Sequence, residues 1–269
     1  MKKHSWILLI PVFLGACVPY EGTLPPEALT TTLNRGPFRE LDPGASELES
    51  LHFKIRAYGS DNTKQVSELA EADYNRIMLD TNLYSFHPTG LYEIVVYGSA
   101  DEYHKKTSQP DWSGGATVGN AIYTYVSPAL AGTLAHEMTH LIFFEYMGRV
   151  TIDHRWVNEG LAVYEEMAAL GGRGDMFPSA RASMRQLPLP MDQMIHLVPA
   201  TEREKTVSVW YCEAESMVQF MVERGGRIGF SQFLDALKNG RSFDEAFPAG
   251  FAQWRSLADF EREWLRAQQ

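Results

Sequence analysis

The chain has 269 residues, which is enough for one large domain or two small ones with a sizeable buried core. Apolar residues make up 45% and charged residues 22% of the chain, close to globular averages, so a wholly disordered protein is excluded. The formal net charge of −10 disfavours contact with phosphate backbones, and we expect no nucleic-acid partner. Two cysteines, Cys17 and Cys212, are too few for a disulfide-stapled scaffold, and Cys212 is expected to be a buried thiol.

Residues 1–16 have the features of a signal peptide. Two lysines precede an apolar run over residues 6–14, which is shorter than the roughly 20 residues that span a bilayer. The run ends in L-G-A-C at residues 14–17, which resembles the bacterial lipobox. The resemblance implies cleavage before Cys17, its acylation and membrane anchoring in the bacterial cell envelope, on the outer membrane facing the periplasm in a Gram-negative cell. The alternative is an ordinary secretory signal with an incidental cysteine.

The first part of the mature chain is predicted to be a tether followed by a small α/β unit. Residues 17–45 carry five prolines and little periodicity, which is typical of a linker. An amphipathic helix is predicted over 61–80, and residues 110–120, with one proline and three glycines, are expected to form a loop. Strands are predicted over 51–58, 91–97 and 121–126.

The second part is predicted to be mainly helical, with a loop-rich stretch over residues 171–200. Proline and glycine positions bound the helices. The fold class is therefore α+β: an α/β part with a mixed sheet over 46–150 leads into a long helix, and a helical part follows over 151–269. Helices are expected over 128–147, 155–170, 206–224, 230–238 and 258–267.

The long helix carries the sequence His136-Glu137-Met138-Thr139-His140, an H-E-x-x-H motif. Residues four apart lie on one face of a helix, so both imidazoles can reach one metal ion. Zn²⁺ prefers four-coordinate sites with nitrogen and oxygen ligands, and a catalytic site keeps one position for water. Glu137 lies between the histidines and can take a proton from such a water.

Glu159 is the expected third ligand. Eighteen residues separate it from His140, which is enough for one helix to end and a second to pack against it. The motif, the spacing and the surrounding W-x-N-E-G-x-A at residues 156–162 resemble the gluzincin metallopeptidases, including M1-type aminopeptidases and bacterial peptidase MA-like domains. The resemblance is strong over 129–170 and looser in the flanks, and it implies a peptidase MA-like domain over residues 46–269.

The resemblance implies Zn²⁺ held by His136, His140 and Glu159, with Glu137 as the general base and a peptide or protein as substrate. Relatives stabilise the oxyanion with a downstream tyrosine or histidine. Tyr211 is the candidate here, on a helix expected to border the cleft, although a packing role for it is equally open. His154 and His196 are weaker alternatives. The strand over 121–126 is expected to offer an edge to an extended peptide.

Two departures from the family pattern affect the expected activity. The aminopeptidases carry G-x-M-E-N before the zinc helix, and its glutamate holds the free amino terminus of the substrate. The corresponding stretch over 114–120 has no acid, which favours an endopeptidase. Some gluzincins orient a histidine with an acid one turn after the third ligand, where this chain has Val163. Glu165 or Glu166 could substitute for that acid, but both lie off the spacing, and a solvated helix face is the simpler interpretation.

Two rival functions remain open from the sequence. One is a catalytically inactive envelope scaffold or binding lipoprotein stabilised by zinc, which would bind the ion at a position closed to water. The other is a zinc hydrolase of a different bond. The sequence does not determine the substrate, the cleavage preference or the oligomeric state.

Overall fold

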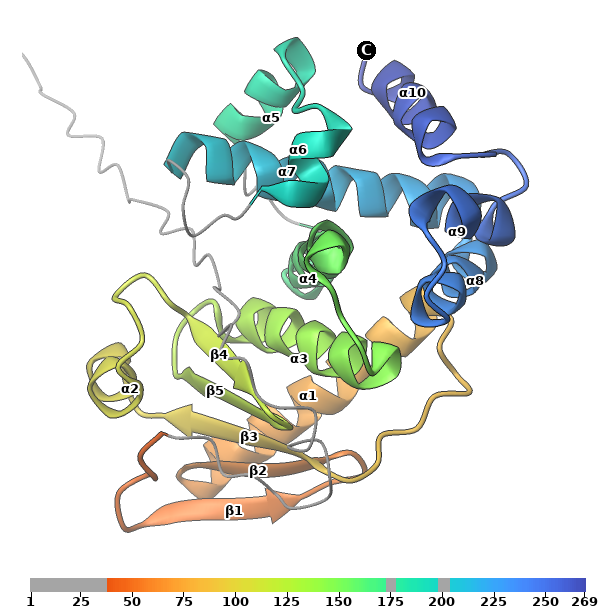
Figure 1. The fold of residues 1–269 in the computed structure, drawn as a ribbon. Coiled ribbons are helices and arrows are strands. Elements are labelled where there is room, and N and C mark those ends of the chain that lie inside the picture. The colour runs from red at the N-terminus through yellow and green to blue at the C-terminus, as the bar shows by residue number, and fades with distance from the viewer. Residues whose placement is uncertain (1–37, 173–177, 198–203) are drawn as a thin grey trace, which may run out of the picture.

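A computed structural model gives the structure of the chain and describes residues 38–172, 178–197 and 204–269. The fold is α+β, as predicted: a five-stranded mixed sheet is followed by a mainly helical part (Figure 1). The expected signal peptide and the lipidation candidate Cys17 lie outside the described residues. Among the described residues, no helix is long and apolar enough to cross a membrane.

The sheet has the strand order β1-β2-β3-β5-β4. Its three inner strands, β2, β3 and β5, run parallel, and the edge strands β1 and β4 are antiparallel to their neighbours. Every residue of β3 is buried, as expected for the central strand of a sheet covered on both faces. The strands are β1 (Ala45–Glu49), β2 (Phe53–Tyr58), β3 (Tyr92–Tyr97), β4 (Gly115–Val118) and β5 (Ala121–Tyr125).

Different elements cover the two faces of the sheet. Helix α1 (Ser60–Thr81) packs on one face, where Ile94 belongs to the main hydrophobic core. On the other face, α2 (Ala100–Thr107) contributes Tyr103 to a smaller cluster, which the N-terminal segment also covers. The Phe38 ring lies edge-on to Tyr123, with 4.8 Å between ring centroids, so the chain already contacts the sheet within the stretch predicted to be a tether.

Strand β4 corrects two expectations. Residues 110–120 were expected to form a loop, but Gly115–Val118 pair with β5 across a tight turn in which Gly119 has a φ of +62°. The strand escaped prediction because glycine and alanine carry little β propensity, and its conformation depends on its partner strand. Strand β5 consequently lies between β3 and β4 and has no free edge, so the edge nearest the long helix belongs to β4.

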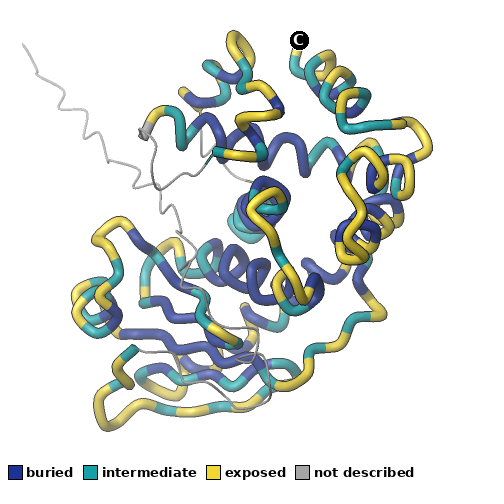
Figure 2. The backbone as a smooth tube through the Cα atoms, in the orientation of Figure 1, coloured by how far each residue is buried: buried dark blue, intermediate teal, exposed yellow. Residues whose placement is uncertain are grey.

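From α3 onward, the described residues contain the five predicted helices and three that were not predicted, α5, α6 and α9. Helix α4 lies between α3 and α7 and contacts both (Figure 1), and Figure 2 shows the burial of the sheet, α3 and α4. Two unpredicted helices, α5 (Pro178–Gln186) and α6 (Met191–His196), lie in the stretch expected to be loop-rich. The others are α3 (Leu130–Met147), α4 (Arg155–Ala169), α7 (Glu204–Phe220), α8 (Arg227–Lys238), α9 (Phe243–Gly250) and α10 (Leu257–Ala267).

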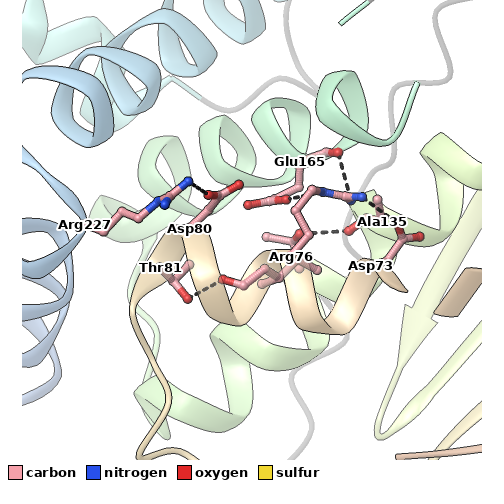
Figure 3. Close-up of polar contacts among 9 residues, drawn as sticks. Asp73, Arg76, Asp80, Thr81, Ala135, Glu165 and Arg227 are labelled. Carbon is pink, nitrogen blue, oxygen red and sulfur yellow. Dashed lines mark hydrogen bonds and ion pairs between the residues drawn. The ribbon is translucent and has the colours of Figure 1, made fainter. Parts of the chain in front are cut away.

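A buried ion pair connects the sheet-covering helix α1 to α4 (Figure 3). Arg76 of α1 places Nε 2.9 Å from Oε2 of Glu165, which is fully buried in α4, and also pairs with Asp73 at 2.8 Å. Glu165 was expected on a solvated face, and this expectation is wrong because α1 covers that side of α4. Burial raises the pKa of Glu165 to about 7, although the positive charge of Arg76 opposes the rise.

Candidate metal centre

Helices α3 and α4 bring His136, His140 and Glu159 together. The two histidines are one helical turn apart on α3, with ring centroids 4.8 Å apart, and Glu159 lies in the second turn of α4. Oε2 of Glu159 is 3.9 Å from Nε2 of His136 and 3.7 Å from Nε2 of His140. The three potential ligand atoms all lie within 4.8 Å of one another, so this group could hold a metal ion.

Within the described part of the chain, the atoms that face each other in this group have no hydrogen-bond partner. Nε2 of both histidines and both carboxylate oxygens of Glu159 are buried and unsatisfied. Buried polar atoms are normally hydrogen-bonded, and a convergent set of unsatisfied acceptors is a destabilising arrangement unless a cation completes it. The residues therefore fit a metal ion, and two nitrogens with a carboxylate are a donor set that Zn²⁺ prefers.

The outer nitrogen of each imidazole has a partner on α4. Nδ1 of His136 lies 2.9 Å from Oε2 of Glu166, and Nδ1 of His140 lies 3.1 Å from Oδ1 of Asn158. An Nδ1–H that donates to these oxygens leaves Nε2 as the lone-pair nitrogen that a metal requires. The two contacts fix the orientation of both rings toward Glu159.

Of the two acids that could substitute for the one absent at Val163, Glu166 is the one that contacts His136. Glu166 follows Glu159 by seven residues, or two helical turns, so both project from the same side of α4 toward α3. Gly132 makes this approach possible, because a Cβ there would lie 3.1 Å from Cγ of Glu166. The expectation of a solvated Glu166 is therefore wrong.

The pKa shifts of the three residues reflect dense packing of charge. Burial disfavours a charged His136, but the hydrogen bond to Glu166 and the surrounding carboxylates raise its pKa to about 9. Burial and the neighbouring His136 lower the pKa of His140 to about 3. Burial raises the pKa of Glu159 to about 8. Burial is thus the first cause of all three shifts, and at His136 the hydrogen bond and the neighbouring carboxylates outweigh it.

Glu137 lies beside the three residues and contacts β4. It is only 1% exposed, and its charge acts on the pKa values of both His136 and Glu159. The hydroxyl of Thr117 in β4 lies 2.8 Å from Oε2 of Glu137. Thr117 has no recognisable signal in the sequence, because its stretch was expected to be a loop.

Tyr211 reaches the site from α7. Its side chain lowers the pKa of the Glu159 carboxyl, against the larger effect of burial. The approach of α7 depends on Gly160, because a Cβ there would lie 2.3 Å from the backbone oxygen of Ala214. Helices α4 and α7 cross so closely here that only glycine fits at position 160, directly after Glu159.

The two alternative histidines make other contacts. Nδ1 of His154 lies 3.3 Å from the backbone nitrogen of Thr151 in a capping interaction. His196 pairs with Asp192 on an exposed part of α6. Of the three candidates, Tyr211 is therefore the residue that the fold brings to Glu159. Cys212, next to it, is a fully buried thiol, as predicted.

No protein-family model matches the chain, and no curated protein matches it either. The interpretation of the site therefore depends on its own residues and geometry.

Proposed function

We propose that the protein is a zinc-dependent metallopeptidase of gluzincin type that hydrolyses peptide bonds, acting as an endopeptidase rather than an aminopeptidase. The observation that carries the proposal is the convergence of buried, unsatisfied atoms from His136, His140 and Glu159. The carboxylate of Glu137 beside them supports a catalytic use of the ion, because three protein ligands leave a fourth position for water.

The roles of the residues follow from their chemistry. A bound Zn²⁺ would polarise the scissile carbonyl and acidify water at its open position. Glu137 accepts a proton from the attacking water and then passes it to the leaving amine nitrogen. The Tyr211 hydroxyl is the group we assign to donate to the developing oxyanion. Glu166 and Asn158 hold the two imidazoles in place.

The preference for internal peptide bonds rests on the stretch before α3. Residues 114–120 contain no acid, so this segment supplies no carboxylate for a free substrate amino terminus. Peptides with blocked amino termini should therefore be cleaved as well as free ones. Loss of cleavage on blocking would instead indicate an aminopeptidase.

A second candidate is a catalytically inactive scaffold or binding protein stabilised by zinc. The burial of the site favours it: His136, His140 and Glu159 are 4%, 2% and 0% exposed. A structural ion fits such a closed position, whereas a catalytic ion needs access for substrate.

The deciding experiment measures zinc content and cleavage of a broad peptide library. The full chain is compared with Glu137→Gln, which keeps the three ligands, and with His140→Ala, which removes one. We expect one zinc per chain and cleavage in the parent, with zinc kept and cleavage reduced roughly 10²–10⁴-fold in Glu137→Gln. His140→Ala should lose both. Equal cleavage by parent and Glu137→Gln contradicts the mechanism, and zinc without cleavage supports the scaffold.

We further propose that acylation of Cys17 anchors the protein to the membrane of the bacterial envelope, on the periplasmic side of the outer membrane in a Gram-negative cell. The L-G-A-C sequence at residues 14–17 supports this. Several acyl chains give a stable anchor, whereas a single chain binds only marginally. Incorporation of labelled fatty acid into the parent but not into Cys17→Ser, with release of the variant from membranes, is the expected result.

A further inference from the structure

Strand β4 holds the side chain of Glu137 through two residues that point to the same face. Thr117 places its hydroxyl oxygen 2.8 Å from Oε2 and 3.0 Å from the backbone oxygen of Glu137. Gly115, two positions earlier, faces the same helix: a Cβ there would lie 2.8 Å from Cγ2 of Thr133, 3.1 Å from Cγ of Glu137 and 3.3 Å from Oε1 of Glu137. Residues two apart on a strand share a face. Thr117 therefore donates a hydrogen bond to Glu137, and Gly115, which has no side chain, leaves room for it.

The position of these two residues is fixed by the hairpin. Thr117 pairs with Ile122 and Gly115 with Thr124 in the antiparallel ladder, and β4 also contacts α3. Two further hydrogen bonds fix the start of the strand: Ser113 donates to the oxygen of Gly115, and Thr124 donates to the oxygen of Gly114, each at 2.8 Å. A one-residue shift of register would turn Thr117 away from α3, because alternate residues face opposite sides.

We propose that Thr117 is a positioning residue that sets the orientation of the Glu137 carboxylate. The inference rests on the proposed peptidase function. Glu137 is 1% exposed, so little water competes for the hydrogen bond to Oε2. A hydrogen bond to a charged acceptor is stronger than one between neutral groups, so it favours one rotation of the carboxylate. The orientation of a general base affects the rate of the chemical step, and it has less effect on how tightly the substrate binds.

The test compares Thr117→Val, which keeps the branched shape but removes the hydroxyl, with Thr117→Ser, which keeps the hydroxyl. Thr81→Val is a matched control, since Thr81 is also buried and donates to a backbone oxygen, that of Ile77, at 2.6 Å. We expect Thr117→Val to keep its zinc and KM and to lose roughly 10-fold to 100-fold in kcat. Thr117→Ser and Thr81→Val should stay within about threefold of the parent.

A second readout does not depend on activity. Crystal structures of the zinc-free variants should show the Glu137 carboxylate rotated away from Gly115 in Thr117→Val and unchanged in Thr117→Ser. Thr117→Ala removes the hydroxyl without adding bulk, should displace the carboxylate in the same way, and serves if Thr117→Val does not fold. An unchanged carboxylate in the folded variants, or full kcat in Thr117→Val, overturns the inference.

The outcomes also separate this inference from the proposed function. If the parent cleaves peptides, Glu137→Gln does not and Thr117→Val matches the parent, only the role of Thr117 is wrong. If parent and Glu137→Gln behave alike, the proposed function fails and the role of Thr117 fails with it.

Discussion

Oε2 of Glu166 lies 2.9 Å from Nδ1 of His136, which it follows by thirty positions in the chain. The contact crosses from α4 to α3 at the point where Gly132 leaves room for the glutamate side chain. It couples the imidazole that faces Glu159 to an acid on the same helix as Glu159. The second helix therefore both contributes a candidate ligand and orients another.

Removal of the Glu166 carboxylate should weaken metal binding. We expect Glu166→Ala to lower zinc affinity roughly 10-fold to 100-fold, because the His136 ring loses the partner that fixes its tautomer and orientation. Glu166→Gln should lose less, since its amide oxygen can still accept from Nδ1–H. Competition with a chromogenic chelator measures the affinity. Glu68→Gln, on an exposed part of α1, is the control, and an affinity of Glu166→Ala equal to that of the control would contradict the assignment.

Substitution of Gly160 should disrupt the crossing of α4 and α7. The Cβ of Gly160→Ala would lie 2.3 Å from the oxygen of Ala214, so the helices must separate. We expect a loss of about 1–3 kcal/mol or more in the free energy of unfolding, measured by urea titration. Gly90→Ala is the control, because nothing lies within 4 Å of a Cβ there and its φ is not positive. Equal midpoints for the two variants would show that the crossing is not tightly packed.

Loss of Arg76 should leave two carboxyl groups buried without their partner. We expect Arg76→Met to lower the free energy of unfolding by about 3–5 kcal/mol near pH 8, because Glu165 and Asp73 then lack a compensating charge. Burial raises the pKa of Asp73 to about 6, so the loss should be smaller at pH 5, where both acids are protonated. The double variant Arg76→Met/Glu165→Leu should recover part of the stability, and a single variant as stable as the parent at pH 8 would refute the prediction.

Glu213 should make stability depend on pH. It is fully buried in α7, and burial raises its pKa from the ordinary 4.5 to about 8, although the backbone N–H of Leu189 donates to it and lowers the value. Because the pKa of Glu213 is higher in the folded state, the folded state binds more protons than the unfolded state between pH 4.5 and 8. The contribution of Glu213 to the free energy of unfolding is therefore fully present below about pH 4.5 and is lost as the pH rises through 8.

The measurement compares the parent with Glu213→Gln, whose amide mimics the protonated acid. The free energy of unfolding of the parent relative to the variant should fall by about 1.4 kcal/mol per pH unit across the steepest part of the range from pH 4.5 to 8. A constant difference between the two proteins over that range would show that Glu213 does not titrate there.

The sequence by itself determined the helical and strand segments with strong periodicity and the identity of the metal-ligand candidates. His136 and His140 share a helix face by spacing alone, and the helix that carries Glu159 begins at Arg155 as predicted. These features are local: a turn of helix or an alternating strand is encoded within a few consecutive residues. The α+β class followed from the order of those segments.

Only the tertiary structure decided which residues support the site. The strand conformation of Gly115–Val118 depends on pairing with β5, so the contact of Thr117 with Glu137 has no local signature. Glu166 reaches His136 because Gly132 admits it, and Glu165 is buried because α1 supplies Arg76. Each of these contacts joins segments between 20 and 89 residues apart, and their geometry follows from the packing of whole elements rather than from sequence spacing.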